Sequence, residues 1–360
     1  MTSVFTSKVA RRAFAAATAV AVGLTMSACA GDTAAPGADD EVKVTLILKD
    51  LVNPFFVALQ KGAEAQAEKD GVNLTIASGK KDGDEEGQIQ AIENAVLKGE
   101  DGILVLPAGP AVNSAITKAR EAGLVVIALD TPPDPIDTTD QTFATDNFEA
   151  GKLIGEWAAS ATAGTDVVIA LLDQFDDRII QTDLNRDQGF LTGMGIDTAD
   201  LGQNGDEAQA GTFSGGNYTI ACQEATTGAE DGGREAMENC LTANSDINLV
   251  YTINEPSAAG AYKALQAAGL ENDVKIVSID GSCEGVANVA SGIISATSQQ
   301  YPVNMATLGV ETIASVVRGG DYPPVSDGLD FYNTGTALVT DATQDGVDSI
   351  TSEEATEICW

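Results

Sequence analysis

Short apolar runs separated by amphipathic stretches recur along this chain, and this alternation restricts the fold more than any other feature. The runs are rich in β-branched residues and nearly continuous, a pattern typical of parallel strands buried on both faces. We expect strands at Val42–Leu48, Asn73–Ala77, Gly102–Leu106, Leu124–Leu129, Val167–Leu172, Tyr218–Ala221, Leu249–Ile253, Lys275–Ile279 and Ile294–Thr297.

The stretches between these runs have helical spacing of their apolar residues. We expect helices at 55–70, 85–97 and 111–122, and Gly71 and Gly123 follow the first and the third as C-terminal caps. Alternation of strands and helices predicts doubly wound α/β sheets with right-handed crossovers. Because the strands are too many for one comfortable open sheet, and 360 residues suffice for about two domains, we expect two lobes.

The first residues have the layout of a secretory signal. Lys8, Arg11 and Arg12 precede an apolar stretch from Ala13 to Leu24 that is too short for a comfortable membrane span. Small residues then lead to Cys29, and this end of the signal resembles a bacterial lipobox. We therefore expect a lipoprotein signal peptide at 1–28, a lipid on Cys29 and a flexible tether at 29–41; the alternative is an ordinary cleaved signal with an incidental Cys.

Composition excludes several classes of function. The chain has no histidine, which removes Ser-His-Asp and Cys-His catalysis and His-liganded zinc but leaves carboxylate chemistry open. The formal net charge of −35 disfavours nucleic acid as a partner. We expect no cofactor and no metal site.

Five cysteines include Cys29 and four others, an even number that suits an oxidising compartment. Cys222 and Cys240 bracket a Gly-rich acidic loop, and Cys283 and Cys359 are left over. We expect disulfides 222–240 and 283–359, although four cysteines allow three pairings and reduced, buried thiols are the alternative.

Polar residues stand where several expected strands end, and ligands of open α/β sheets bind beyond the carboxyl ends of the strands. These residues are Asn53, Asp130, Asn254, Asp280 and Gln300. Each alone could be a helix cap or an Asx-turn. Their recurrence at separate strand ends instead favours a common binding site.

The segments Lys49–Phe56, Leu129–Thr131, Ala144–Asn147, Asn185–Phe190, Ile253–Glu255, Ile279–Gly281 and Gln299–Pro302 stand in a characteristic order and spacing. Together they resemble the sugar-binding proteins of ABC importers of the ribose-binding type, within the type I periplasmic binding proteins. The match runs from about Val42 to about Thr340. Within this family the chain most resembles the fructose-importer branch, through Tyr251–Pro256, Thr297–Pro302 and the position of Cys240 after Met237–Asn239.

The resemblance implies roles for individual residues. Hydrogen bonds to sugar hydroxyls would come from Asn53, Asp130, Arg186, Asn254, Asp280 and Gln300, with Lys49 and Thr131 also at contact positions. Phe55 and Phe56 would lie against the sugar ring, although both could be core residues. Arg186, buried beside Asp130 and Asp280, would keep the cleft carboxylates ionised; the alternative is a surface salt bridge.

The sequence departs from the ribose pattern at Leu106 and Thr131, where that type has Asn and Arg. The second stacking aromatic has no clear counterpart, because the corresponding region, 228–233, is Gly-rich. Phe175 is a candidate substitute.

We expect a first lobe of 42–145 plus 301–333 and a second lobe of 146–300 plus 334–360, with three crossings near Asp146, Gln300 and Asn333. The lobes would close on a monosaccharide, fructose first and ribose or mannose next, and present it to an ABC permease and its ATPase. The protein would be a monomer and not an enzyme. It would be anchored to the outer face of the cell membrane by the lipid on Cys29. A receptor for a sugar-like signal and a carboxylate-dependent glycosidase are the alternatives.

Overall fold

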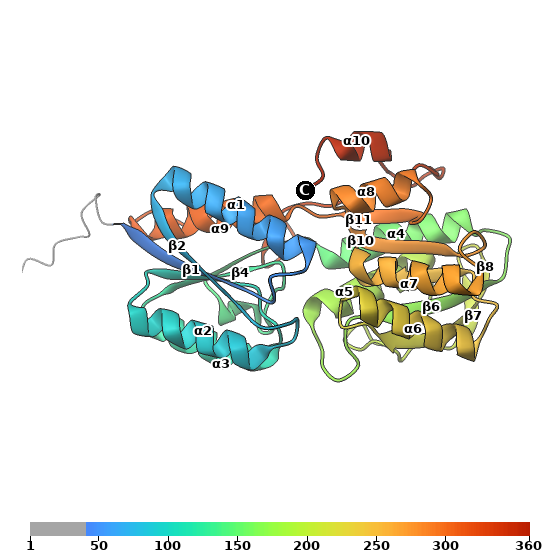
Figure 1. The fold of residues 1–360 in the computed structure, drawn as a ribbon, viewed down its shortest axis with the longest axis horizontal. Helices are drawn as coiled ribbons and strands as arrows, with labels where there is room; N and C mark the ends of the chain where they lie inside the picture. The colour runs from blue at the N-terminus through green and yellow to red at the C-terminus, as the bar shows by residue number, and fades with distance from the viewer. Residues whose placement is uncertain (1–40) are drawn as a thin grey trace, which may run out of the picture. The chain divides into compact units, whose positions relative to one another are not determined.

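The computed structural model describes residues 41–360, which belong to one compact unit. The expected signal peptide, lipidation site at Cys29 and most of the tether lie outside the described residues. Two sheets organise the described chain, and the elements of the first lobe come first (Figure 1). They are β1 (Val42–Leu48), α1 (Pro54–Asp70), β2 (Val72–Ser78), α2 (Glu85–Lys98), β3 (Gly102–Val105), α3 (Asn113–Glu121), β4 (Val125–Leu129) and β5 (Gln141–Ala144).

The second lobe follows with a longer series of elements. They are α4 (Asn147–Ala161), β6 (Val167–Asp173), α5 (Gln181–Met194), β7 (Ala210–Phe213), β8 (Gly216–Ala225), α6 (Glu230–Ala243), β9 (Leu249–Thr252), α7 (Glu255–Ala268), β10 (Lys275–Asp280), α8 (Cys283–Ala290) and β11 (Ala296–Gln299). The chain then returns to the first sheet through α9 (Pro302–Val317) and β12 (Tyr332–Asn333). It ends in the second lobe with β13 (Ala337–Val339) and α10 (Ser352–Thr356).

The first sheet has six strands in the order β12-β5-β4-β3-β1-β2, and the second has seven in the order β13-β11-β10-β9-β6-β8-β7. All pairs are parallel except β7 with β8 and β11 with β13. Helices cover both faces of each sheet (Figure 1). The predicted α/β class, two-lobe architecture and three crossings are therefore confirmed.

The layers follow from where the apolar side chains of each strand point. In the first lobe, Leu46 and Leu48 face the core under α1 and α9, whereas Ile47 faces the core under α2 and α3. In the second lobe, α4 and α5 close one face of the sheet, and α6, α7 and α8 close the other. Strands with both faces covered need the nearly continuous apolar runs that the sequence contains.

The helices α4 and α5 pack closely against each other, and this packing fixes the position of Arg186, one of the predicted binding residues. A Cβ on Gly151 or Gly155 of α4, or on Gly189 or Gly193 of α5, would collide with the backbone of the facing helix. These glycines let the two backbones touch. The contact sets the position of Arg186, which α5 carries into the interior.

The structure differs from the sequence-based expectations in a few elements. The strand expected at 218–221 extends to Gly216–Ala225, and the helix expected at 111–122 begins with a 3-10 turn at Pro110–Val112 before α3. β5, β7, β12 and β13 were not expected, because all four are short and the first three lack an apolar run. Among residues 41–360, no helix combines the length and the apolarity that a bilayer crossing requires.

Both expected disulfides are present. Cys222 of β8 pairs with Cys240 of α6, and Cys283 at the start of α8 pairs with Cys359. Within the described residues, no group of three or more acidic, Cys or His side chains is placed to hold a metal ion.

Candidate binding site

A buried charged cluster forms where strands of the first sheet end. The Lys49 ammonium, just past β1, lies 3.8 Å from Oδ2 of Asp130 and 3.9 Å from Oδ2 of Asp82. The hydroxyl of Thr131 donates to the same oxygen of Asp130 at 2.8 Å. Burial raises the pKa of Asp82, and the charge of Lys49 opposes that increase. The predicted residues Lys49, Asp130 and Thr131 are thus brought together.

The first helix places Asn53 and Phe55 at the same edge. Pro54 opens α1, and the Asn53 side chain caps it by accepting a hydrogen bond from the Phe55 amide at 2.9 Å. Phe55 and Phe56 are both buried and pack edge to face with ring centroids 5.9 Å apart. Phe55 lines a cavity, whereas Phe56 points into the core of the first lobe.

In the second lobe, Asp280 and Gln300 form a buried pair. Asp280 ends β10, and its Oδ1 accepts from the Gln300 side-chain amide at 3.0 Å. Its Oδ2 accepts from the backbone amide of Glu255 at 3.2 Å. The side-chain oxygen of Gln300 is buried and has no hydrogen-bond partner within the described residues, so it retains the capacity to accept from a ligand.

Arg186 is buried, so the surface salt-bridge alternative is wrong. Its guanidinium donates to Oδ1 of Asn147 and to the carbonyl of Ile253, each at 2.8 Å. Both of these hydrogen bonds go to neutral oxygens and neither to a cleft carboxylate. The guanidinium is still close enough to lower the pKa of Asp280 through its charge.

The expectation that Arg186 keeps Asp280 ionised is wrong. Burial, and next the nearby carboxylate of Glu255, raise the pKa of Asp280 to about 8 and outweigh the guanidinium. Burial also raises the pKa of Glu255, although Glu255 accepts hydrogen bonds from Gly281, Ser282 and Thr297. The two acids therefore share a site in which at least one proton is retained near neutral pH.

Asn254 has the capping role that was its alternative. Its Oδ1 accepts from the Ser257 amide at 3.0 Å at the start of α7, and its Nδ2 donates to the Gly228 carbonyl at 2.9 Å. A ligand role for Asn254 stays a prediction.

Asp130 and Asp280, the two strand-end carboxylates, both have positive φ, at 66° and 153°. Residues other than glycine rarely adopt such angles, and strain of this kind concentrates at functional sites.

A cavity of about 500 Å³ lies between the lobes, a size typical of small-molecule sites. The first lobe contributes Asn53, Phe55 and Asp82, and the second contributes Phe175, Glu255 and Asp280, among others. The remaining predicted residues, Lys49, Phe56, Asp130, Thr131, Arg186, Asn254 and Gln300, are buried and do not line this cavity.

A family model for the periplasmic binding protein domain matches residues 44–321. The chain belongs to this family. The ribose import binding protein RbsB of Escherichia coli (strain K12) is 28% identical over 277 residues, covering 77% of this chain and 85% of the relative. The D-allose-binding periplasmic protein of the same organism is 26% identical over 298 residues, which are 82% of this chain and 91% of the relative.

Solved structures of ABC transporter solute-binding proteins share the fold. An ABC transporter solute-binding protein from Mycobacterium smegmatis with bound glycerol has a TM-score of 0.72 at 24% identity, covering 89% of this chain and 98% of that one. One from Agrobacterium vitis with bound D-fucose has a TM-score of 0.72 at 24% identity, covering 88% and 100%. The relatives are binding proteins of transporters and not enzymes.

Sequence reasoning missed most of the residues that line the cavity, among them Asp82, Glu255 and Trp360. Asp82 lies in the turn before α2 and Glu255 opens α7, so neither directly ends an expected strand, and no strand-end signal marked them as ligand contacts. Trp360 also lines the cavity. Its signal was its position next to Cys359, whose expected partner Cys283 lies three residues after Asp280.

Proposed function

We propose that this protein captures a monosaccharide between its lobes and delivers it to an ABC permease driven by an ATPase. D-Fructose is the first candidate, and D-ribose and D-mannose follow. Polar groups of both lobes, Asn53 and Asp82 from the first and Glu255 and Asp280 from the second, line a cavity between the lobes, and this observation carries the proposal. The family and the sugar-binding relatives support it.

The chemistry of the site suits a polyol ring. Carboxylate, carboxamide and ammonium groups can meet hydroxyls, and the face of Phe55 can cover the apolar C–H face of a ring. Closure would be driven by the higher affinity of the closed state for the sugar. We propose hydrogen-bonding roles for Lys49, Asn53, Asp130, Thr131, Arg186, Asn254, Asp280 and Gln300.

We propose lobe boundaries of 42–145 plus 301–333 and 146–300 plus 334–360. The strand memberships of the two sheets support them. We also propose anchoring to the outer face of the cell membrane through a lipid on Cys29. Replacing Cys29 by Ser should release the protein from the membrane fraction of expressing cells; an unchanged membrane fraction would count against the lipid.

A thermal-shift screen of the full chain against fructose, ribose, mannose, allose and other monosaccharides tests the function. Binding to the folded state raises the melting temperature by mass action, so at least one sugar should raise it. A matching incubation with aryl glycosides should release no product. Turnover of a glycoside, or no shift with any sugar, would count against the proposal.

A further inference from the structure

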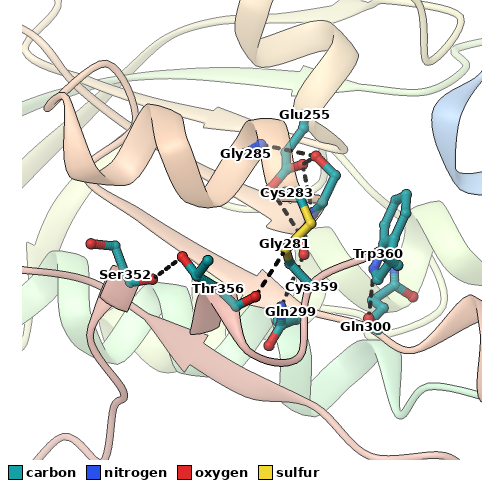
Figure 2. The surroundings of a disulfide bond; sticks show 11 residues. Glu255, Gly281, Cys283, Gly285, Gln299, Gln300, Ser352, Thr356, Cys359 and Trp360 are labelled. Atoms are coloured by element: carbon teal, nitrogen blue, oxygen red, sulfur yellow. Dashed lines mark hydrogen bonds between the residues drawn. A yellow bond between two sulfur atoms is a disulfide. The ribbon is translucent and has the colours of Figure 1, made fainter. Parts of the chain in front are cut away.

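Trp360 lies across the two lobes at the wall of the cavity. Its ring packs edge to face on Phe55 of α1, with centroids 5.5 Å apart and planes at 86°. Its side chain joins the hydrophobic cluster of the first lobe. Its indole N–H donates to the Gln300 carbonyl at 2.8 Å, at the crossing that leads out of β11 (Figure 2). The residue therefore touches both a cavity aromatic and the segment that carries Gln300.

A disulfide holds this residue at the site. Cys359 is bonded to Cys283, which opens α8 directly after the Asp280–Ser282 turn. The Cys283 amide also donates to the Trp360 carbonyl at 3.1 Å. Figure 2 shows the disulfide close to Gly281 and below Glu255, with Trp360 to one side of it. The covalent link thus joins Trp360 to the same turn that presents Asp280.

We propose that Trp360 is a ligand-contact residue and that the Cys283–Cys359 disulfide positions it. This inference rests on the proposed function and adds to it the aromatic surface for which the sequence offered no clear counterpart. Phe55 and Trp360 stand nearly perpendicular and both line the cavity, so they form two adjoining apolar walls beside the polar groups of Asn53 and Asp280. An indole offers a large rigid surface to the C–H face of a sugar ring.

The disulfide gives the site a dependence on oxidation state. Besides the disulfide, this segment is held by the five-residue helix α10, by the hydrogen bonds of Trp360 and by its contact with Phe55. Reduction would therefore loosen the indole wall and leave the two sheets intact. Since the Cys222–Cys240 bridge lies in the same lobe and its residues do not line the cavity, it is the matched control.

Calorimetry on the full chain, with a sugar that shifts the wild-type melting temperature, tests the assignment. Trp360→Ala should weaken binding by about tenfold and Trp360→Phe by less. The Cys283→Ser/Cys359→Ser variant should weaken binding severalfold, whereas Cys222→Ser/Cys240→Ser should leave affinity unchanged. Circular dichroism and melting curves verify that each variant is folded.

Fluorescence supplies a second readout, because the chain has only two tryptophans. Trp157 is buried in the core of the second lobe, where its indole donates to the Ala342 carbonyl. Sugar should change the emission of the wild type and of Trp157→Phe but not that of Trp360→Phe.

Two failures are distinguishable. Wild-type affinity in Trp360→Ala, with no emission change from Trp360, would overturn this inference and leave the proposed function standing. Absence of binding by the wild type to any monosaccharide would overturn both.

Discussion

The side-chain amide of Gln174 donates a 2.7 Å hydrogen bond to Oδ2 of Asp82 and so joins the two lobes across the cleft. Gln174 directly follows β6 of the second lobe, and Asp82 precedes α2 of the first. Nearby, the Arg178 guanidinium reaches the Gly83 carbonyl at 3.3 Å, and the hydroxyls of Thr182 and Thr131 lie 3.2 Å apart. These contacts stabilise the arrangement of the lobes seen in the structure.

Removing the Gln174 contact should weaken sugar binding. Gln174→Ala loses one interlobe hydrogen bond and leaves Asp82 poorly paired, so affinity should fall by about 1 kcal/mol, roughly fivefold. Isothermal titration calorimetry with the bound sugar measures the change. Gln90→Ala, an exposed glutamine in α2, is the control and should bind as the wild type does. Equal affinities in both variants would show that the contact plays no part in closure.

Asp130→Ala should weaken sugar binding more strongly. The carboxylate lies beside Lys49 and accepts from Thr131, so its loss would leave a buried ammonium and a sugar hydroxyl poorly paired. We expect a loss of about 2–4 kcal/mol of binding free energy. Asp137→Ala removes an exposed carboxylate of the same lobe and should not change affinity. Calorimetry that finds the two variants alike would remove Asp130 from the site.

The raised pKa of Asp280 should make stability depend on pH. Its pKa increases from its usual value near 3.8 to about 8 in the folded state. Between these values the folded protein holds a proton that the unfolded chain releases. This contribution to the free energy of unfolding is therefore complete below about pH 4 and is lost as pH rises through about 8. The raised pKa of Glu255 acts in the same direction.

Urea denaturation at intervals between about pH 4 and about pH 8 measures this dependence. Asp280→Asn should reduce the loss of stability with rising pH relative to the wild type, whereas Asp137→Asn at an exposed position should not. A wild-type slope that survives in Asp280→Asn would assign the titration to another group.

The Cys222–Cys240 disulfide should matter for stability and not for binding. It links β8 to α6 across 18 residues and packs in the core of the second lobe. Its removal in Cys222→Ser/Cys240→Ser should lower the free energy of unfolding by roughly 3 kcal/mol in the chain-entropy model. Chemical denaturation measures the loss. An unchanged midpoint would mean that the bridge adds nothing in this fold.

Much of the fold could be predicted because strands buried on both faces need apolar runs such as Val42–Leu48, whose bounds match β1. The short strand β5 could not, since Gln141–Ala144 mixes polar and apolar residues and depends on pairing with β4 and β12. Asp280 was found because it ends an apolar run. Trp360 was missed because its place is set by a disulfide between two cysteines that are 76 residues apart in the sequence, and not by a local pattern.

The behaviour of Arg186 shows the same limit. Its sequence context predicted burial near the carboxylates, and it is buried. Which oxygens it would meet depended on the contact between α4 and α5, which brings Asn147 to its Nε. The balance of burial and charge that raises the pKa of Asp280 likewise depends on the packing of Glu255 beside it.

Calorimetric titration of the wild type and of two isosteric variants, one from each lobe, tests the account most directly. Asn53→Asp keeps the cap of α1 but removes amide donors, and Asp280→Asn removes a carboxyl; both positions line the cavity. We expect one monosaccharide bound per wild-type chain and an affinity about tenfold lower in each variant. No sugar bound by the wild type, or both variants binding as tightly as the wild type, would contradict a single sugar site built from both lobes.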